Sequence, residues 1–281
     1  MSVTPINFKN IPVQAGVISK IISLDVNSNN CFQELDDLIS SDQGVTSLLL
    51  RVVNSPFYNR GNKVATIPFA ISLLGYSVVR SLALMAFSRS LFSQTRNETF
   101  RLHIWQHSLL TAIASQYICQ EFGNSKLNDE AFIAGLMHDT GKVLMFNHNP
   151  AMYQDVFKYA FENNCSSVQA EHHYFGFDHC QVGIEAVKEW KLPERFTDYM
   201  GVDLSAPLED HQDDTVMTYL KVANYLIKVA GIGGNEIDNI DIKKSALASF
   251  GLHDTLHENL LHDQFIPGLM ENDTYKLCAS I

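Results

Sequence analysis

A histidine and an aspartate stand next to each other at positions 138 and 139, inside the segment GLMHDTGK at residues 135–142. An imidazole nitrogen and a carboxylate oxygen are both common ligands of divalent metal ions, so His138 and Asp139 could bind one ion together. Two ligands do not complete a site, because an ion needs at least two further donors and neighbouring groups that orient them. The chemistry of this chain therefore depends on which other residues reach the pair.

The composition limits the class of protein to which the chain can belong. Its 281 residues are 46% hydrophobic, which is typical of a globular protein with one large core or two smaller ones. No apolar run approaches the roughly 20 residues that span a bilayer, and the first five residues lack the pattern of an export signal. We expect a cytoplasmic protein with no membrane partner.

The charge and the cysteines exclude two further classes. A formal net charge of −11 disfavours a nucleic-acid partner, because non-specific binding depends on clustered lysine and arginine, and a nucleotide ligand would need a local basic pocket. The cysteines are scattered and lack the paired spacing of a zinc site or a redox dithiol. We expect them to be reduced packing residues: Cys31, Cys119, Cys165, Cys180 and Cys278.

Apolar residues recur at helical spacing along almost the whole chain, as in the segment from Val45 to Val53, and no segment shows the alternation of a half-buried strand. Asp42 precedes that segment and could cap its helix. Asn128 or Asp129 precedes the helix that leads to His138 in the same way. These patterns predict an all-α protein.

Three polar segments interrupt the helical pattern. Residues 54–56 (NSP) end the helix before them, because proline disfavours helical geometry in its predecessor. Residues 92–98 separate two strongly apolar stretches, so we place a boundary between two helical parts there. Residues 204–214 form a polar loop, and Asp213 or Asp214 in it precedes a carboxy-terminal helix.

Several separated motifs occur together in one order. The first half contains ELDDLISSD at 34–42, LLLRVVNSPFY at 48–58 and IPFAISLLG at 67–75. The second half contains WQHS at 105–108, AGLMHDTGK at 134–142, HCQVG at 179–183 and WKLP at 190–193. In order and spacing these motifs resemble the HDOD family, the HD-related output domains of bacterial signalling proteins. The resemblance covers roughly residues 11–203 and is specific because it rests on several motifs.

The resemblance implies a multi-helix bundle of the HD-domain type joined to an amino-terminal helical subdomain. The HDOD domain would span residues 11–203, with the amino-terminal part at about 11–92 and the HD-like bundle from about 98. Helices in residues 213–281 would pack on that bundle. The resemblance also implies a regulatory role, because HDOD proteins are generally regarded as signalling or scaffold modules, often without a demonstrated enzymatic activity. Their partners would be other signalling proteins.

The resemblance also implies a set of metal ligands. In HD phosphohydrolases, to which the family is related, one metal is held by a histidine, the His-Asp pair and a distant aspartate. These positions correspond here to His107, His138, Asp139 and, in place of the aspartate, Asn224 in the segment KVANYL. A neutral amide oxygen binds a cation more weakly than a carboxylate does. The site would hold at most one divalent ion, such as Fe, Mn, Zn, Mg or Ni, or form a hydrogen-bonded knot without one.

Relatives with two metals, the cyclic-dinucleotide phosphodiesterases of the HD-GYP type, use more histidines. His179 lies four residues before Gly183, much as one of those ligands does, and is a weaker candidate here. The family commonly has a histidine pair where this chain reads YMGVD at 199–203, and the chain has no Gly-Tyr-Pro sequence. A two-metal centre would lack several ligands, which disfavours hydrolysis of a phosphodiester.

Lys142 lies one turn after His138 and is the candidate catalytic residue, because it could orient a phosphate. We favour a simpler interpretation, in which a lysine near a helix end interacts with the helix dipole. The other histidines of this region also have simple interpretations. His172, His173 and His179 would be surface or capping groups around a helix that Asp178 caps, and His253 and His257 would be solvated.

Two hypotheses for the function follow, and a third shares features of both. The first is a non-catalytic, standalone regulatory module of the HDOD type that acts through protein–protein contacts. The alternative is a metal-dependent phosphohydrolase acting on a nucleotide or phosphodiester, with a bound water as nucleophile and Lys142 assisting the phosphate. The third is a pocket that binds a nucleotide without cleaving it.

Overall fold

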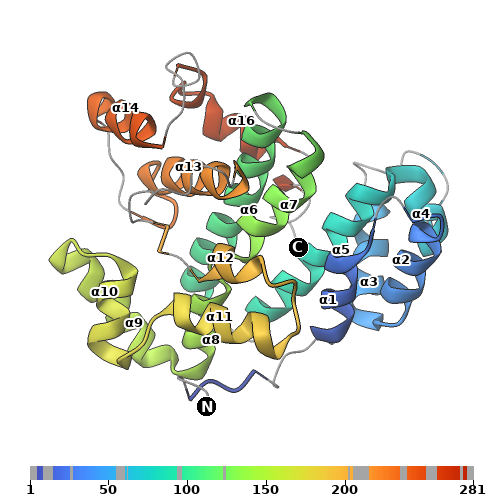
Figure 1. Cartoon of the computed structure of the whole chain (residues 1–281), viewed down its shortest axis with the longest axis horizontal. Coiled ribbons are helices and arrows are strands. Elements are labelled where there is room, and N and C mark those ends of the chain that lie inside the picture. The colour runs from blue at the N-terminus through green and yellow to red at the C-terminus, as the bar shows by residue number, and fades with distance from the viewer. Residues whose placement is uncertain are drawn as a thin grey trace.

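The computed structural model (Figure 1) describes residues 5–8, 15–25, 28–54, 61, 63–93, 97–122, 125–201, 203–204, 215–234, 239–250, 258–272 and 275–276. Every regular element in these ranges is a helix, which confirms the predicted all-α fold. None of these helices is both long enough and apolar enough to cross a membrane. Four of the cysteines lie in the described ranges as free thiols, and Cys278 lies outside them.

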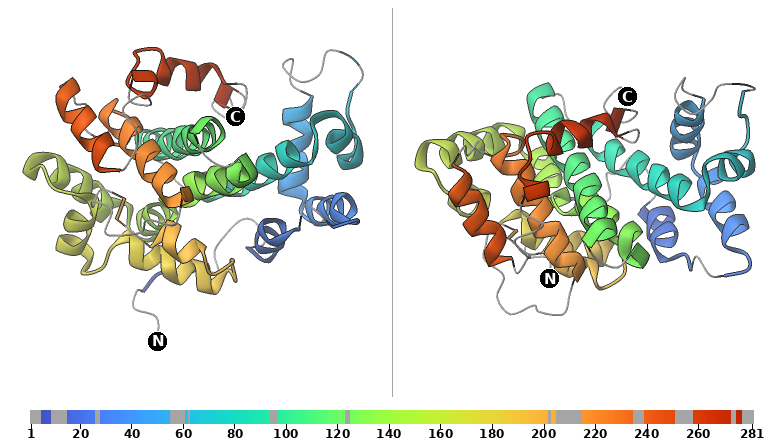
Figure 2. Two further views of the ribbon diagram at one scale, coloured as in Figure 1. Left: turned by 45° about the horizontal axis from the view of Figure 1, so that its top comes forward. Right: turned by 90° about the horizontal axis from the view of Figure 1, so that it is seen from above.

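Five helices lie together at one end of the molecule, drawn in blue to teal in Figures 1 and 2: α1 (Ala15–Ser23), α2 (Cys31–Ser40), α3 (Gln43–Val53), α4 (Ile67–Leu74) and α5 (Tyr76–Ser93). Their apolar faces meet in a core that includes the fully buried side chains of Ile18, Leu35, Ile39 and Leu49. The Asp42 carboxylate caps α3, as predicted, by accepting hydrogen bonds from the backbone N–H groups of Gly44 and Val45.

α3 ends at Val53, in agreement with the break predicted at residues 54–56, of which 55 and 56 lie outside the described ranges. The Asn54 side-chain amide donates hydrogen bonds to the carbonyl oxygens of Leu50 and Val64, at 2.7 and 2.6 Å. The first bond satisfies a carbonyl of the last helical turn, and the second ties the end of α3 to the segment before α4.

α6 (Glu98–Phe122) runs through the middle of the molecule, and α7 (Asn128–Met137) and α13 (Thr215–Val229) both pack against it (Figure 2). The contact with α7 is close at Gly135, where an added Cβ would lie 2.5 Å from the Cα of Ala112. The missing side chain therefore lets the end of α7 approach α6, which places the residues that follow α7 next to the side chains of α6.

The start of α7 differs from the prediction. A 3-10 turn, Ser125–Leu127, leads directly into Asn128, so Asn128 and Asp129 both lie in the first turn of the helix. Leu127 occupies the capping position and makes no side-chain cap. The prediction that Asn128 or Asp129 precedes this helix is wrong. The 3-10 turn runs directly into the helix, so the helix begins without a capping side chain. Asp213 and Asp214 lie outside the described residues.

The remaining helices complete the bundle: α8 (Thr140–His148), α9 (Pro150–Asn163), α10 (Ser167–Phe175), α11 (His179–Glu189), α12 (Phe196–Met200), α14 (Ile240–Ser249) and α16 (Phe265–Glu271). α9 packs against α10, and α8 packs against α11. At the second contact an added Cβ on Gly141 would lie 2.0 Å from the carbonyl oxygen of His179. The first turn of α8 is thereby held against the first turn of α11.

Candidate functional site

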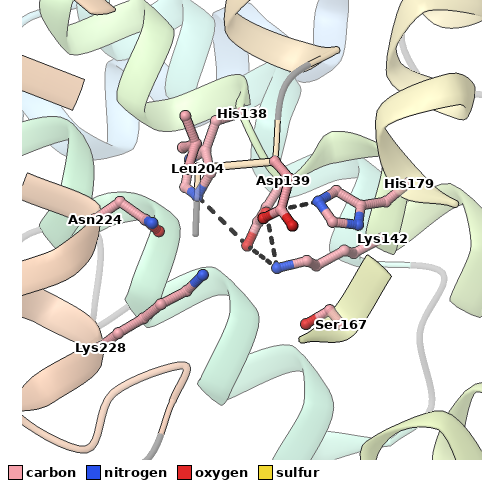
Figure 3. A pocket seen from close by; sticks show the side chains of 9 residues that line it. His138, Asp139, Lys142, Ser167, His179, Leu204, Asn224 and Lys228 are labelled. Carbon is pink, nitrogen blue, oxygen red and sulfur yellow. Dashed lines mark hydrogen bonds and ion pairs between the residues drawn. The ribbon is translucent and has the colours of Figure 1, made fainter. Parts of the chain in front are cut away.

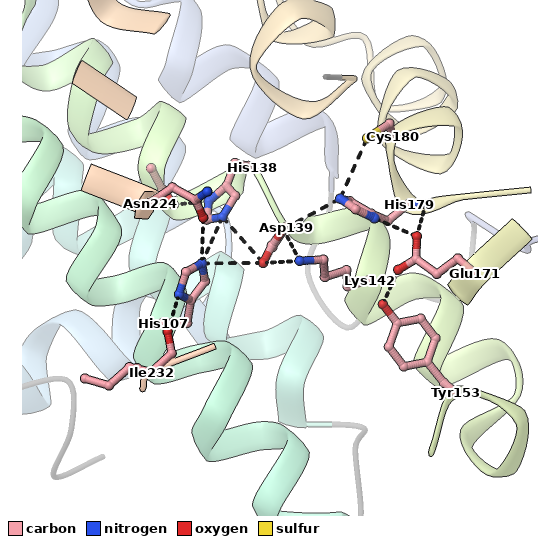
Figure 4. Close-up of polar contacts among 11 residues, drawn as sticks. His107, His138, Asp139, Lys142, Tyr153, Glu171, His179, Cys180, Asn224 and Ile232 are labelled. Carbon is pink, nitrogen blue, oxygen red and sulfur yellow. Dashed lines mark hydrogen bonds and ion pairs between the residues drawn. The ribbon is translucent and has the colours of Figure 1, made fainter. Parts of the chain in front are cut away.

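His107, His138 and Asp139 come together at the centre of the bundle (Figure 4). His107 lies on α6, whereas His138 and Asp139 form the junction between α7 and α8. The Nε2 atoms of the two histidines are 3.3 Å apart, and Asp139 Oδ2 lies 3.4 Å from that of His138 and 3.7 Å from that of His107. All three side chains are buried, and among the described residues they form a group whose ligand atoms lie within 4.8 Å of one another.

The hydrogen bonds of the two Nδ1 atoms leave the two Nε2 atoms as the ring nitrogens that could bind a metal ion. His138 Nδ1 lies 2.7 Å from the carbonyl oxygen of Gly135, and His107 Nδ1 lies 2.9 Å from that of Ile232. A carbonyl oxygen only accepts hydrogen bonds, so both Nδ1 atoms must donate. Burial lowers the pKa of His107 well below its ordinary value, so this ring is neutral. In the neutral His107 ring Nε2 therefore carries the lone pair, and this lone pair faces Nε2 of His138.

Asn224 on α13 completes the group. Its Oδ1 atom lies 3.1 Å from His107 Nε2, at the position that the resemblance implies for the fourth ligand. Two imidazole nitrogens, one carboxylate oxygen and one amide oxygen, each of which can ligate a metal ion, then lie close together. Such a donor set fits a single divalent cation, and the outer hydrogen bonds to carbonyl oxygens are the partners that commonly orient ligating histidines.

A turn after α13 supports His107. Gly233 adopts a φ of +80°, and an added Cβ there would lie 2.5 Å from His107 Nδ1. A side chain at this position would both strain the backbone and collide with the ring. The glycine therefore lets the turn approach closely enough for the Ile232 carbonyl to accept the hydrogen bond from His107.

Lys142 is paired with Asp139. Its Nζ atom lies 2.9 Å from both carboxylate oxygens, and both residues are buried. Burial would raise the pKa of Asp139, but the nearby His138 and Lys142 outweigh this effect and hold it well below its ordinary value. Burial would lower the pKa of Lys142, but the Asp139 charge outweighs this effect and raises it. The two groups therefore form a charged pair.

This placement corrects the interpretation of Lys142 as a cation at a favourable helix end. Lys142 lies in the first turn of α8, where the helix dipole is positive and repels a cation. The Asp139 carboxylate, immediately before the helix, compensates for that repulsion. The sequence interpretation failed because it assumed one helix through residues 135–142, whereas the chain starts a new helix after Asp139.

His179 is also buried, which corrects its interpretation as a surface or capping group. It is the first residue of α11, and its backbone N–H and its Nδ1 both donate to Glu171 Oε2, at 2.8 and 2.6 Å. Burial would lower the pKa of His179, but the Glu171 charge outweighs this effect and raises it to about 10. The ring is therefore protonated, with Nε2 directed towards Asp139 Oδ1 at 3.9 Å. A protonated imidazole has no lone pair for a metal.

Sequence reasoning did not find Glu171 and Tyr153. Glu171 is fully buried on α10, and its second oxygen accepts a hydrogen bond from the hydroxyl of Tyr153 on α9 (Figure 4). Within a polar segment next to two histidines, a glutamate gives no signal of burial. The packing of α10 between α9 and α11 is what removes it from solvent.

The other histidines have separate positions. His172 donates from Nε2 to Asp178 Oδ2 at 2.7 Å, and Asp178 caps α11, as predicted, by accepting from the backbone N–H of Gln181. The His173 ring is exposed and stacks on Tyr159 at a centroid distance of 4.5 Å. His253 and His257 lie outside the described residues.

A small pocket opens beside the cluster (Figure 3). It is lined by His138, Asp139, Lys142, Ser167, His179, Asp203, Leu204, Asn224 and Lys228. Sequence reasoning did not nominate Ser167, Asp203 or Lys228. Burial, followed by the charge of Lys142, lowers the pKa of Lys228 to about 8. The two lysines therefore lie close enough for their charges to repel each other across the pocket.

Solved structures with the same fold come from several bacteria. An HDOD domain protein of unknown function from Geobacter sulfurreducens is 21% identical, with a TM-score of 0.74 over 98% of this chain and 93% of that one. A candidate phosphohydrolase from Shewanella amazonensis SB2B is 19% identical, with a TM-score of 0.65 over 94% and 92% of the two chains. A candidate signal transduction protein from Marinobacter aquaeolei VT8 is 20% identical, with a TM-score of 0.73 over 96% and 60%. At these identities the likeness shows the fold alone.

An uncharacterized protein of Treponema pallidum (strain Nichols) is 21% identical over 213 residues. The match spans 75% of this chain and 41% of that protein, so this chain corresponds to less than half of its relative. The model of the HDOD domain matches residues 11–203, which include His107, His138, Asp139 and His179. The chain belongs to the HDOD family.

Proposed function

We propose that this chain is a non-catalytic regulatory module that transmits a signal through contacts with other signalling proteins. The observation that carries the proposal is the donor set at the centre of the bundle. Asp139 is its one carboxylate, and Lys142 already compensates the charge of that group. Asn224 adds no charge, so the set offers a cation little net electrostatic attraction.

The state of His179 supports the same conclusion. A second metal beside the first would need donors on the His179 side of Asp139, because His107, His138 and Asn224 lie on the other side (Figure 4). The imidazole there is protonated by its pairing with Glu171 and repels a cation. Two metals that together activate water and bind a phosphodiester are therefore disfavoured among the described residues.

One divalent ion remains compatible with the site. His107, His138, Asp139 and Asn224 would hold it, and when bound it would act as a Lewis acid and link α6, the α7–α8 junction and α13. The competing arrangement has no ion. In that case the Asn224 amide turns so that its NH₂ group donates to His107 Nε2, which satisfies the lone pair of that nitrogen.

A metal-dependent phosphohydrolase is the second candidate function, and the pocket beside the cluster favours it. Lys142 and Lys228 both line this pocket, and either could neutralise a phosphate next to a bound ion. This function requires that one ion suffices to acidify a water molecule, although Lys142 has neutralised the carboxylate of the site.

The two candidates differ in turnover. We would purify the protein without chelators, measure its metal content, and assay hydrolysis of p-nitrophenyl phosphate and bis-p-nitrophenyl phosphate with added Mn²⁺, Fe²⁺, Mg²⁺, Zn²⁺ or Ni²⁺. The expected result is at most one ion per chain and no turnover above that of His138→Ala and Asp139→Ala. Turnover that both substitutions abolish would overturn the non-catalytic proposal. A metal content near zero would assign the cluster to the hydrogen-bonded arrangement.

A further inference from the structure

The outer face of α4 is apolar, although this helix lies at the surface of the molecule. α4 has the sequence IPFAISLL, which contains no charged residue. Its inner face is buried at Ile67, Ala70 and Ile71, whereas the side chains of Phe69 and Leu73 are 48% and 47% exposed. A helix that is apolar on all sides is ordinarily buried on all sides. The outer face of α4 is therefore a surface that another molecule could cover.

The apolar surface continues from α4 onto α2. Phe69 and Leu73 lie one helical turn apart, so they share one face of α4. Tyr76 follows at the start of α5, and its ring contacts that of Phe32 on α2 at a centroid distance of 5.7 Å. Phe32 is itself 57% exposed. These four residues are called the α2–α4 patch: Phe32, Phe69, Leu73 and Tyr76.

The α2–α4 patch lies at the outer edge of the amino-terminal helices (Figures 1 and 2). α4 packs against α2, α3 and α5, and these contacts cover its inner face. Exposed apolar residues that occur singly are normal on a protein surface, whereas apolar residues gathered on adjacent helices mark an interaction site. The position of the patch leaves it accessible to a partner.

α2 gives the patch an acidic edge. This helix contains Glu34, Asp36 and Asp37 and no lysine or arginine. Burial raises the pKa of Tyr76, and the Glu34 carboxylate adds to this effect against the opposing charge of Arg80. The charge of Glu34 therefore acts on a residue of the patch itself.

The charges distinguish between three possible occupants. A second copy of this chain would bring the same acidic helix to the interface, and each copy carries a net charge of −11. The carboxylates of α2 would also be repelled by a membrane surface rich in anionic lipids. A helix with apolar side chains on one face and lysine or arginine beside them matches both the apolar surface and its acidic edge. Arg51 on α3 and Lys63 before α4 are exposed cations, so the basic side of such a helix would face α2.

We propose that the α2–α4 patch binds a cationic amphipathic helix of a partner protein. The apolar side chains of that helix would cover Phe69 and Leu73, and its lysine or arginine side chains would contact the carboxylates of α2. This inference deepens the proposed function and rests on it, because it names the surface through which a regulatory module would contact another signalling protein.

The test measures binding of a synthetic peptide by fluorescence anisotropy. The probe is a fluorescein-labelled peptide of leucine, lysine and alanine, about 18 residues long, with leucine at positions i, i+3, i+4 and i+7 so that one helical face is apolar. One control peptide has the same composition in an order that spreads leucine around the helix. A second control has glutamate in place of every lysine. We expect saturable binding of the probe and at least about tenfold weaker binding of both controls.

Four variants locate the binding surface. Phe69→Ser and Leu73→Ser remove apolar contacts and should each weaken binding about tenfold, whereas Phe161→Ser, which removes a 73% exposed phenylalanine of α9, is the matched control and should leave binding unchanged. Glu34→Gln keeps the apolar surface intact and should weaken binding about twofold at low salt and less at high salt. Glu189→Gln, an exposed change on α11, is its control. Circular dichroism and thermal unfolding check that each variant is folded.

Three results would overturn the proposal: no saturable binding of the probe, equal affinity in Phe69→Ser and the parent protein, or equal binding of the glutamate peptide. Sedimentation velocity and co-sedimentation with phosphatidylcholine–phosphatidylglycerol vesicles test the other occupants. Self-association or vesicle binding that Phe69→Ser abolishes would assign the patch to a second copy or to a membrane and would also overturn it. Turnover is measured separately with p-nitrophenyl substrates, so failure of this surface is distinguishable from failure of the non-catalytic proposal.

Discussion

His107 and His138 show how a few hydrogen bonds determine the chemistry of a buried site. Backbone carbonyls accept from both Nδ1 atoms, which leaves the two Nε2 atoms facing each other at 3.3 Å. The lone pair on Nε2 of the neutral His107 is unfavourable in a buried environment unless a cation or a donor lies beside it. Asn224, with both a carbonyl oxygen and an NH₂ group on one side chain, is compatible with either solution.

Asn224→Asp tests this balance. A carboxylate 3.1 Å from His107 Nε2 adds a full negative charge to the donor set, so a divalent ion should bind at least about tenfold more tightly. Without metal the variant should be less stable than the parent, because a second buried carboxylate joins Asp139. Competition with a fluorescent chelator measures the affinity. Asn239→Asp, an exposed change of the same charge at the cap of α14, should alter neither property.

Glu171→Gln tests the charged pair behind the pocket. The folded-state pKa of His179, about 10, lies above the unfolded value of about 6.5, so the pair stabilises the protein fully below pH 6.5. This contribution decreases as the pH rises from 6.5 towards 10. The variant should be less stable by a few kcal/mol at pH 6.5, and the difference from the parent should shrink at higher pH.

Urea denaturation at several pH values between 6 and 10 measures this difference. The titration of Lys228 in the same interval changes stability in the opposite direction, since its folded-state pKa is lowered, but it contributes to both proteins and largely cancels in the comparison. Glu189→Gln, an exposed change on α11, is the control. A difference that stays constant with pH would contradict a protonated His179.

At the scale of the elements, glycines allow the helices of the site to approach each other. Gly135 lets α7 approach α6, and Gly141 lets α8 approach α11. These two contacts bring His138 towards His107 and Lys142 towards the start of α11. The positions of the functional side chains therefore depend on residues that have no side chain themselves.

Gly141→Ala should lower the free energy of unfolding by about 1–3 kcal/mol or more, because the new Cβ would lie 2.0 Å from the backbone oxygen of His179 and α11 would have to move. Gly268→Ala is the matched control. Gly268 lies exposed within α16 with no atom within 4 Å of an added Cβ, so alanine should raise stability by up to about 1 kcal/mol through its helix propensity. Chemical denaturation measures both. Equal effects would show that α8 and α11 are not closely packed.

At the scale of the whole molecule, Arg80 connects the amino-terminal helices to the central bundle. This buried side chain of α5 donates to the carbonyl oxygens of Ile21 and Ile22 on α1, at 3.1 and 2.7 Å. Its guanidinium also lies 3.6 Å from Asp129 Oδ2 on α7. One residue therefore contacts three helices that belong to both parts of the fold.

Arg80→Met keeps most of the apolar stem of the side chain but leaves two carbonyls and Asp129 without this donor. We expect a loss of about 2–4 kcal/mol of stability. We also expect faster cleavage of the amino-terminal helices by a protease, since their attachment to α7 is weakened. Arg51→Met, an exposed change on α3, should leave both measurements unchanged.

The pattern of residues along the chain was sufficient to predict the all-α class, the family, the cap of α3 by Asp42 and the grouping of His107, His138 and Asp139. Helical periodicity, capping and motifs are local properties, and residues within one or two turns express them whatever the tertiary structure does. The family resemblance then related the distant motifs to a single site.

The partners of the buried charges were decided only by the packing of the helices. Lys142 pairs with Asp139 because a new helix begins between them, and His179 is protonated because α10 brings Glu171 behind it. Lys228 lies near Lys142 because residues of α13 line the same pocket. Burial and counter-charge depend on residues far apart in sequence, so a polar side chain such as Glu171 has the same local signature whether it lies on the surface or in the core.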